Sequence, residues 1–169
     1  QRFANTFFDN FSKEKIIWLV LTDKASFAYE PNSYLVNDSA FMMVGNNLKY
    51  LLAILNSKPC EWLFTKITTS SGVGTIMWKK TYIEQLPIPE IPKPEMQPFE
   101  ILTDYITYIK KQEEAISPYS PNNHMAVNFE ELADACVYEL YFGEHMKEKQ
   151  IDVLQFVTPL LKPIDHLNE

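Results

Sequence analysis

The sequence predicts an α+β fold, in which a small mixed or antiparallel sheet with short covering helices is followed by a helical C-terminal part. Residues 15–44 favour strands because they are rich in β-branched, aromatic and turn residues. Residues 48–67 carry apolar side chains at helical spacing. Residues 93–169 are acidic and again helix-patterned. Between these parts lies Ile76–Pro92, IMWKKTYIEQLPIPEIP, where one kind of sequence gives way to the other.

The strands are expected before residue 45. Lys15–Thr22, KIIWLVLT, is a near-continuous apolar run typical of a buried strand. Ser26–Glu30, SFAYE, is a second short strand, and Pro31–Ser33 is a turn. A third strand is predicted from Tyr34 to about Val44, with an interruption near residues 37–39.

Two short helices are expected to cover this sheet. Leucines at positions i, i+3, i+4 and i+7 make one apolar stripe of a helix over Leu48–Asn56. Asn47 can cap its first turn. Pro59 breaks the chain before a second helix at Cys60–Ile67. The polar segment Thr68–Thr75, TTSSGVGT, is the most loop-like stretch of the chain.

The prolines around Leu86–Pro89, LPIP, predict an extended linker that follows a strand at Ile76–Trp78 and a helical turn at Thr81–Gln85. Each proline lacks a backbone donor and biases the preceding residue toward extended geometry. Further prolines prolong this exit: Pro92, Pro94 and Pro98. A ligand for a proline-recognition module is the other interpretation, but the alternating apolar residues favour packing. We therefore divide the chain into domains at residues 1–92 and 93–169.

Helices dominate the prediction beyond this linker. The first has an apolar face over Phe99–Ile109, and a polar loop is expected at Tyr119–Asn128. Asn128 and Glu131 fit a capping box that would open the second helix, and Gly143 can end it. A last short helix follows.

The charge of the chain is unevenly distributed. The net charge of −7 divides into about +2 for residues 1–94 and about −9 for residues 95–169. Any surface that binds a polyanion is therefore expected in the first part, whereas the acidic second part is better suited to packing on protein.

Few residues point to a metal, a disulfide or a membrane. Cys60 and Cys136 lie far apart on apolar faces, which favours buried free thiols in a reducing cytoplasm. The histidines show no ligand spacing, so we expect no metal site. No apolar run approaches the roughly 20 residues that span a bilayer, and no signal peptide is visible. Because the sequence starts at full complexity with Gln1, we expect a fragment of a longer polypeptide.

Known catalytic motifs are absent. Gly72 and Gly74 lack the lysine spacing of a phosphate loop, and no nucleophile elbow, HExxH or kinase signature is present. The sequence also lacks an Asn-Pro-Pro-Tyr-like tetrapeptide for a flipped adenine and an acidic pair followed by lysine for a nuclease magnesium. We therefore expect no catalytic residue and no cofactor in this fragment.

Several segments in their order along the chain resemble the TaqI-like C-terminal specificity domain over roughly residues 10–92. They are KIIW at Lys15–Trp18, FAYE at Phe27–Glu30, YLLAILNS at Tyr50–Ser57 and LPIP at Leu86–Pro89, with VYELYF at Val137–Phe142 resembling a segment that often closes such polypeptides. The resemblance implies a module that reads double-stranded DNA for a methyltransferase domain of the same polypeptide. That domain would bind S-adenosylmethionine and methylate adenine, with or without a fused, magnesium-dependent nuclease as in type IIG enzymes.

The polar loop and the lysines beside it are the candidate DNA-binding residues. Hydroxyls can reach base edges and lysines can hold phosphates, and the loop glycines allow close approach of the backbone. The candidates are Lys66, Thr68, Thr69, Ser70, Ser71, Lys79 and Lys80. A plain solvent loop leading into a strand is the alternative for any one of them, and Trp78 is expected in the core. Arginine, the commonest reader of guanine, occurs only as Arg2.

Two other function classes remain open at this point. A non-catalytic scaffold would dock its acidic helices on a partner domain, and an enzyme would need a carboxylate or histidine cluster that the sequence does not display. A salt titration separates the first from DNA recognition, since DNA affinity falls steeply with salt.

Overall fold

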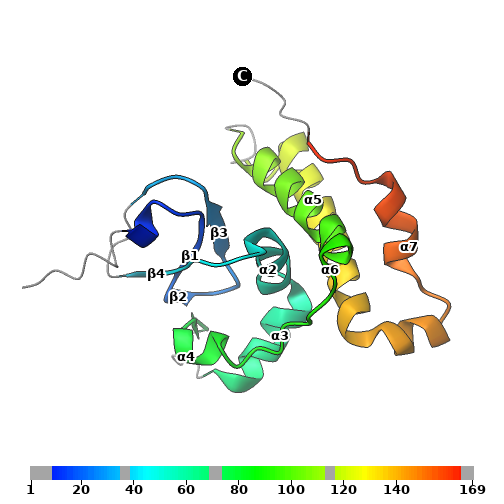
Figure 1. The fold of residues 1–169 in the computed structure, drawn as a ribbon, viewed down its shortest axis with the longest axis horizontal. Coiled ribbons are helices and arrows are strands. Elements are labelled where there is room, and N and C mark those ends of the chain that lie inside the picture. Colours follow the sequence, from blue (N-terminus) through cyan, green and yellow to red (C-terminus); the bar gives the residue numbers. More distant parts are fainter. Residues whose placement is uncertain (1–8, 35–38, 69–73, 113–116, 165–169) are drawn as a thin grey trace, which may run out of the picture. The chain divides into compact units, whose positions relative to one another are not determined.

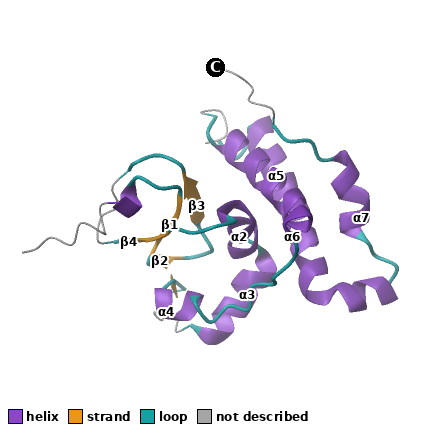
Figure 2. Ribbon diagram, in the orientation of Figure 1, coloured by secondary structure: helices purple, strands orange, loops and turns teal. Residues whose placement is uncertain are grey.

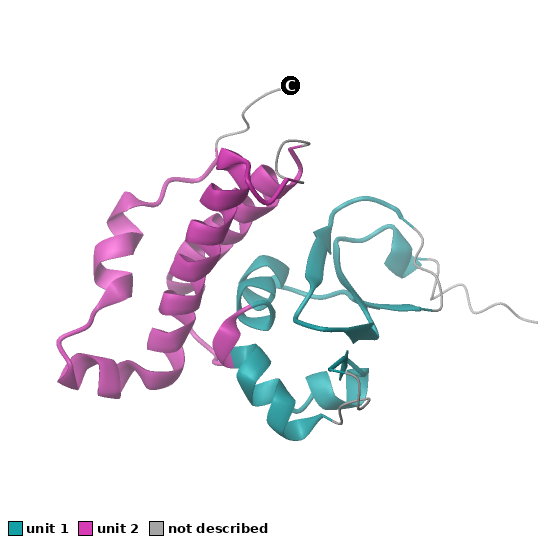
Figure 3. Ribbon diagram, turned by 180° about the vertical axis from the view of Figure 1, so that it is seen from behind, with its two compact units in different colours: residues 1–56, 60–87 teal, residues 57–59, 88–169 magenta. Residues whose placement is uncertain are grey.

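The computed structural model describes residues 9–34, 39–68, 74–112 and 117–164. The chain forms two compact units, coloured separately in Figure 3: residues 1–56 with 60–87, and residues 57–59 with 88–169. The first contains all the described strands, and the second is helical (Figure 2). The predicted α+β class is confirmed, while the functional division at residues 92 and 93 stays a prediction.

The first unit holds two small antiparallel sheets. The larger has the order β3-β1-β4, in which β1 (Lys15–Leu19) lies between β3 (Phe27–Glu30) and β4 (Ala40–Met43). The smaller pairs β2 (Leu21–Thr22) with β5 (Ile76–Met77), which is far away in sequence.

Val20 divides the predicted strand over residues 15–22 between these two sheets. Its N–H donates to Ser39 O at 3.3 Å, next to β4, whereas its C=O accepts from Trp78 N at 2.8 Å, next to β5. The chain therefore changes partners at this residue. The predicted third strand is shorter than expected: Tyr34 lies outside any strand, and residues 35–38 lie outside the described part.

The helices of the first unit follow the sequence pattern closely. α2 (Leu48–Leu55) is confirmed, and α3 (Lys58–Ile67) begins slightly earlier than predicted, with Pro59 in its first turn. α4 (Lys80–Ile83) is a single turn. The expected side-chain cap of Asn47 is wrong. This residue has a left-handed backbone with φ of 55°, whereas a capping side chain normally projects from an extended residue, and the Asn47 side chain makes no capping hydrogen bond.

Aromatic rings form the centre of the first unit. Trp18 lies 5.5 Å from Phe27 and 5.6 Å from Phe41, measured between ring centroids. Trp78 meets Phe27 edge-on at 5.4 Å and stacks on Phe64 at 4.1 Å. Such pairs add to the free energy of burying the rings themselves. The expectation that Trp78 belongs to the core is confirmed, since it is 1% exposed.

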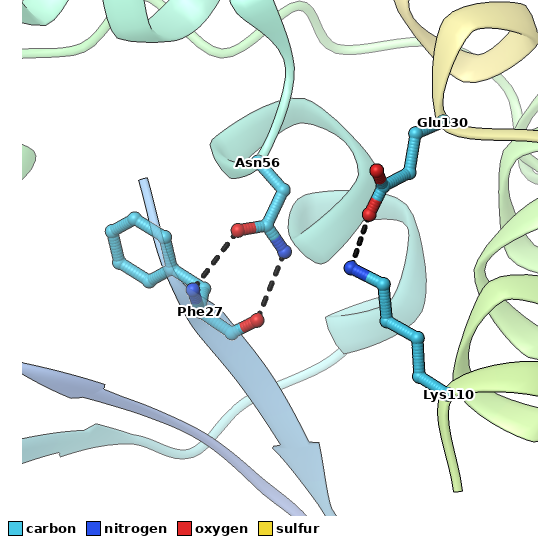
Figure 4. Close-up of polar contacts among 4 residues, drawn as sticks. All are labelled: Phe27, Asn56, Lys110 and Glu130. Atoms are coloured by element: carbon cyan, nitrogen blue, oxygen red, sulfur yellow. Dashed lines mark hydrogen bonds and ion pairs between the residues drawn. The ribbon is translucent and has the colours of Figure 1, made fainter. Parts of the chain in front are cut away.

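The side-chain amide of Asn56, directly after α2, pairs with the backbone of β3 as a neighbouring strand would. Asn56 Oδ1 accepts from Phe27 N and Nδ2 donates to Phe27 O, both at 2.9 Å (Figure 4). Because β3 is an outer strand of its sheet, these backbone groups would otherwise need water. Asn56 thereby ties the end of α2 to the sheet.

A buried lysine closes the other end of this sheet. Lys15 is 0% exposed, and its ammonium donates to three backbone carbonyls, those of Phe11, Lys13 and Asn32. An ammonium has three N–H donors, so this arrangement satisfies it fully. The turn before β1 and the turn after β3 are thus held by one side chain.

The helical unit is built on two long helices, α5 (Lys93–Lys110) and α6 (Pro121–Glu148), which pack on each other (Figure 1). Lys110 and Glu130 form an ion pair between them (Figure 4). α7 (Val153–Val157) and the 3-10 turn η2 (Thr158–Leu160) follow. No helix among the described residues is both long and apolar enough to cross a membrane.

Three predictions for this unit are wrong. Pro94 and Pro98 lie inside α5, where Pro94 occupies the first turn and needs no intrahelical hydrogen bond. The polar loop and the capping box near Asn128 are instead part of α6, which begins after Ser120. Directly before Gly143, where an end was expected, α6 has a kink: the backbone of Phe142 is not helical, with φ of −128° and ψ of 27°, and a second helical segment follows.

The start of α6 shows why the loop prediction failed. Ser120 Oγ accepts from Asn123 N at 3.0 Å, and Pro121 follows the cap at a position that favours proline. The residues that follow are mostly polar, but Ala126 is 1% exposed within the helical unit. Tertiary packing and a local cap therefore stabilise a helix whose composition is typical of a loop.

Candidate nucleic-acid interface

The two ends of the candidate loop are held together by one backbone carbonyl. Thr68, directly after α3, donates from Oγ1 to Met77 O at 2.9 Å. Lys79 N donates to the same carbonyl, also at 2.9 Å. A carbonyl oxygen has two lone pairs, so both bonds can form at once. The structure therefore brings Thr68 and Lys79 together, although eleven positions separate them in the sequence.

Trp78 determines which residues leave the core at this point. Its ring is stacked on Phe64, its N–H donates to Val20 O, and its C=O accepts from Trp18 Nε1 at 2.8 Å. With both backbone groups hydrogen-bonded and the ring stacked, this residue is held in the core. Lys79 and Lys80 come next and are both exposed.

The two lysines differ in their surroundings. Lys79 occupies the position before the first turn of α4, and its ammonium makes no ion pair with any described residue. Lys80 Nζ lies 3.4 Å from Glu84 Oε1 one turn along, and both side chains are largely exposed. An exposed pair of this kind contributes little to stability and can be exchanged for a stronger partner. Lys79 is therefore the better placed of the two for an anion.

Lys66 lies on the exposed side of α3, where its Nζ is 5.2 Å from the centre of the Trp62 ring. Trp62 was not among the residues selected from the sequence. Its position one turn before a lysine and three residues before Thr65 is the signal that places it on the polar face of the helix. The remaining candidates, Thr69, Ser70 and Ser71, lie outside the described residues, and their roles stay predictions.

The buried thiols are poor nucleophiles. Burial raises the pKa of Cys60 and of Cys136 to about 12 from an ordinary value of 9.0. Both are therefore protonated at neutral pH, whereas a reactive cysteine has a lowered pKa. The predicted burial of both residues is confirmed, at 1% and 0% exposure.

Among the described residues of the helical unit, Asp134 has the most buried carboxylate, and its contacts are structural. It is 8% exposed; it accepts from Lys58 N at 2.8 Å and lies 3.3 Å from Lys58 Nζ. Burial raises its pKa above the usual range, although both contacts with Lys58 act in the opposite direction. The pKa of Lys58 is raised by its hydrogen bond to the same carboxylate. Asp134 thus caps the first residue of α3, and its carboxylate is already occupied by the hydrogen bond and the ion pair with Lys58.

A metal centre has no basis in the described part of the chain, where no three histidine, cysteine, aspartate or glutamate residues are grouped so that they could hold an ion. The arrangement around Met77 instead offers two exposed cations, Lys79 and Lys80, next to an aromatic core. Such a surface can bind a phosphodiester backbone.

Comparison with known proteins gives one family. Residues 2–88 match the TaqI-like C-terminal specificity domain. The matched stretch includes the sheets, α2, α3, α4 and the lysines described above. No curated protein matches the chain.

Proposed function

Because the chain belongs to the TaqI-like C-terminal specificity domain family, we propose that it recognises a specific sequence in double-stranded DNA for a restriction–modification polypeptide. The family match over residues 2–88 is the observation that carries this proposal. The matched part covers most of residues 1–94, which are more basic than the rest of the sequence and are therefore better suited to bind a polyanion.

Residues around Met77 divide into positioning and reading roles in this proposal. Lys66 and Lys79 are exposed cations at the end of α3 and before α4, so each is assigned a phosphate contact. Lys80 must first exchange Glu84 for a phosphate. Base reading is assigned to the hydroxyl residues of the loop, because Thr and Ser can donate to or accept from a base edge.

Thr68 has a more limited part in this proposal than the other loop hydroxyls. Its hydroxyl already donates a hydrogen bond to Met77 O, so the oxygen can only accept a further hydrogen bond. We assign Thr68 to holding the loop ends in place. The reading roles then belong to Thr69, Ser70 and Ser71, as predicted from the sequence.

Catalysis is assigned to a separate domain of the same polypeptide. That domain would bind S-adenosylmethionine and methylate adenine, and a fused nuclease domain would require magnesium. Methylation of a base requires that it be rotated out of the duplex. A specificity domain contributes by holding the duplex in one register while this happens.

DNA binding at several salt concentrations tests the proposal. A labelled pool of random duplexes is bound to the polypeptide that carries this chain, and the retained DNA is sequenced and titrated individually. We expect one enriched sequence and an affinity that falls linearly with salt on logarithmic axes. A scaffold would bind no duplex at any salt concentration, and binding without an enriched sequence would exclude a reading role.

Substitution of the lysines locates the phosphate-binding residues. Lys79→Ala combined with Lys80→Ala should weaken all duplexes alike and reduce the salt slope by about one unit for each phosphate that is no longer bound. Lys79→Ala alone should account for the larger part of this loss of affinity, since Lys80 is paired with Glu84. Lys111→Ala, an exposed cation in the helical unit, is the matched control and should leave the slope unchanged.

A further inference from the structure

Trp62 is the only one of the three tryptophans that is exposed to solvent. Its side chain is 60% exposed, whereas Trp18 and Trp78 are 5% and 1% exposed. A single apolar side chain on a surface is common and proves nothing by itself. The neighbours of Trp62 on α3 indicate a more specific role for this side chain.

A cation is held at the Trp62 ring. Lys66 follows one helical turn later, and its Nζ lies 5.2 Å from the ring centroid, within the range of a cation–π contact. Thr65, also exposed, turns its hydroxyl back onto Trp62 O at 2.7 Å. This turn of the helix therefore presents an indole and an ammonium side by side.

The one carboxylate on α3, that of Glu61, is hydrogen-bonded to another part of the chain and not to Lys66. Glu61 Oε2 accepts from Ala25 N at 2.6 Å, which holds it at the turn before β3. The ammonium of Lys66 is therefore not neutralised by an acid of its own helix. The face that carries Trp62 and Lys66 is complementary to an anion with an apolar neighbour.

We propose that Trp62 and Lys66 together contact the sugar–phosphate backbone of one DNA strand. The ammonium would meet a phosphate and the indole would cover the adjoining deoxyribose. This inference rests on the function proposed above. Four residues of helix separate the two side chains by a rise of about 6 Å, which allows them to meet neighbouring groups of one strand. Phosphates and sugars lie on the outside of an intact duplex, and they receive half or more of the hydrogen bonds that proteins make to DNA.

The position of this pair favours DNA over a protein partner. Thr68, two residues after Lys66, is bonded to Met77 O, the carbonyl that also receives Lys79 N. The C-terminal end of α3, which carries Lys66, therefore lies next to the segment with the lysines assigned to phosphates. A backbone contact here would extend that interface along the strand.

Fluorescence of the chain tests the contact directly, because Trp62 dominates the solvent-accessible signal. Acrylamide should quench the emission of the free protein mainly through Trp62. Addition of a duplex at low salt should change the emission and protect it from acrylamide, and Trp62→Phe should abolish both effects. The two core tryptophans remain as an internal reference.

Binding measurements with matched variants separate the two side chains. Trp62→Ala should weaken cognate and random duplexes alike, by about three- to tenfold, with the salt slope unchanged. Lys66→Gln should weaken both and reduce the slope by about one unit. Tyr119→Ala removes an aromatic side chain that is 87% exposed in the acidic helical unit, and it should have no effect.

Each outcome bears on a different claim. Normal DNA binding by Trp62→Ala, together with unprotected emission, overturns the backbone contact and leaves the proposed function standing. A weakening confined to the cognate duplex also overturns it, because a backbone contact does not discriminate between sequences. Failure of the unmodified chain to bind any duplex at low salt removes both proposals.

Discussion

Replacing Asn56 with alanine removes two hydrogen bonds from the outer edge of β3. Both involve the backbone of Phe27 and both are 2.9 Å long. A hydrogen bond of this type contributes a net of about 0.5–1.5 kcal/mol, so their removal should lower the free energy of unfolding by about 1–3 kcal/mol. Since Asn56 is exposed and water can partly replace its amide, we expect a value in the lower half of this range.

Aspartate at the same position makes a sharper test. Asn56→Asp keeps an acceptor for Phe27 N but places a carboxylate oxygen against Phe27 O, where the amide donated. The folded state should therefore favour the protonated acid, which can donate to this carbonyl. The pKa of the new carboxyl is then raised on folding, so the deficit relative to the native chain should be largest at neutral pH and shrink as the pH falls through the folded pKa.

Thermal unfolding followed by circular dichroism at neutral and acidic pH measures both effects. Asn46→Ala, at an exposed position before α2, is the matched control and should unfold like the native chain. If Asn56→Asp were as stable as the native chain at neutral pH, the amide would not act as a strand partner. A deficit that did not depend on pH would equally contradict the argument.

The remaining predictions concern other buried groups. Leu52→Ala removes a side chain that is 5% exposed and should cost about 2–5 kcal/mol in chemical denaturation, so a midpoint unchanged from the native chain would show that α2 is not part of the core. Lys15→Met removes the donor of three hydrogen bonds to backbone carbonyls and should cost about 2–4 kcal/mol in the same measurement, whereas equal stability would mean that water already satisfies them. Burial raises the pKa of Tyr50, as of Cys60 and Cys136, to about 12, from 10.0 for the tyrosine and 9.0 for the thiols. Their contribution to stability is therefore complete below pH 9 and is lost as the pH rises toward 12, so alkaline titration should unfold the chain, and thiol reagents at pH 8 should modify it only after unfolding.

The sequence alone determined the elements whose signal is local. The leucine spacing of α2 predicted a helix that the structure confirms, since an apolar stripe is a property of the helix itself. The order of the motifs, above all YLLAILNS and LPIP, led to the family that the comparison shows. The lysines of the candidate interface were also selected from their neighbours in the chain, and their contact with DNA stays a prediction.

Local signals also misled where they had two meanings. Pro121 after Ser120 indicates a turn, but the same pair is a favoured beginning of a helix. Here the packing of α5 on α6 outweighs the weak preference of the residues involved.

Only the tertiary structure decided how distant residues share their hydrogen bonds. Nothing in the sequence indicates that Thr68 and Lys79 meet at Met77 O, that the Asn56 amide pairs with Phe27, or that Val20 links two sheets. Backbone donors and acceptors are identical along the chain, so their pairing across long separations depends on which apolar side chains pack together and carries no local signature.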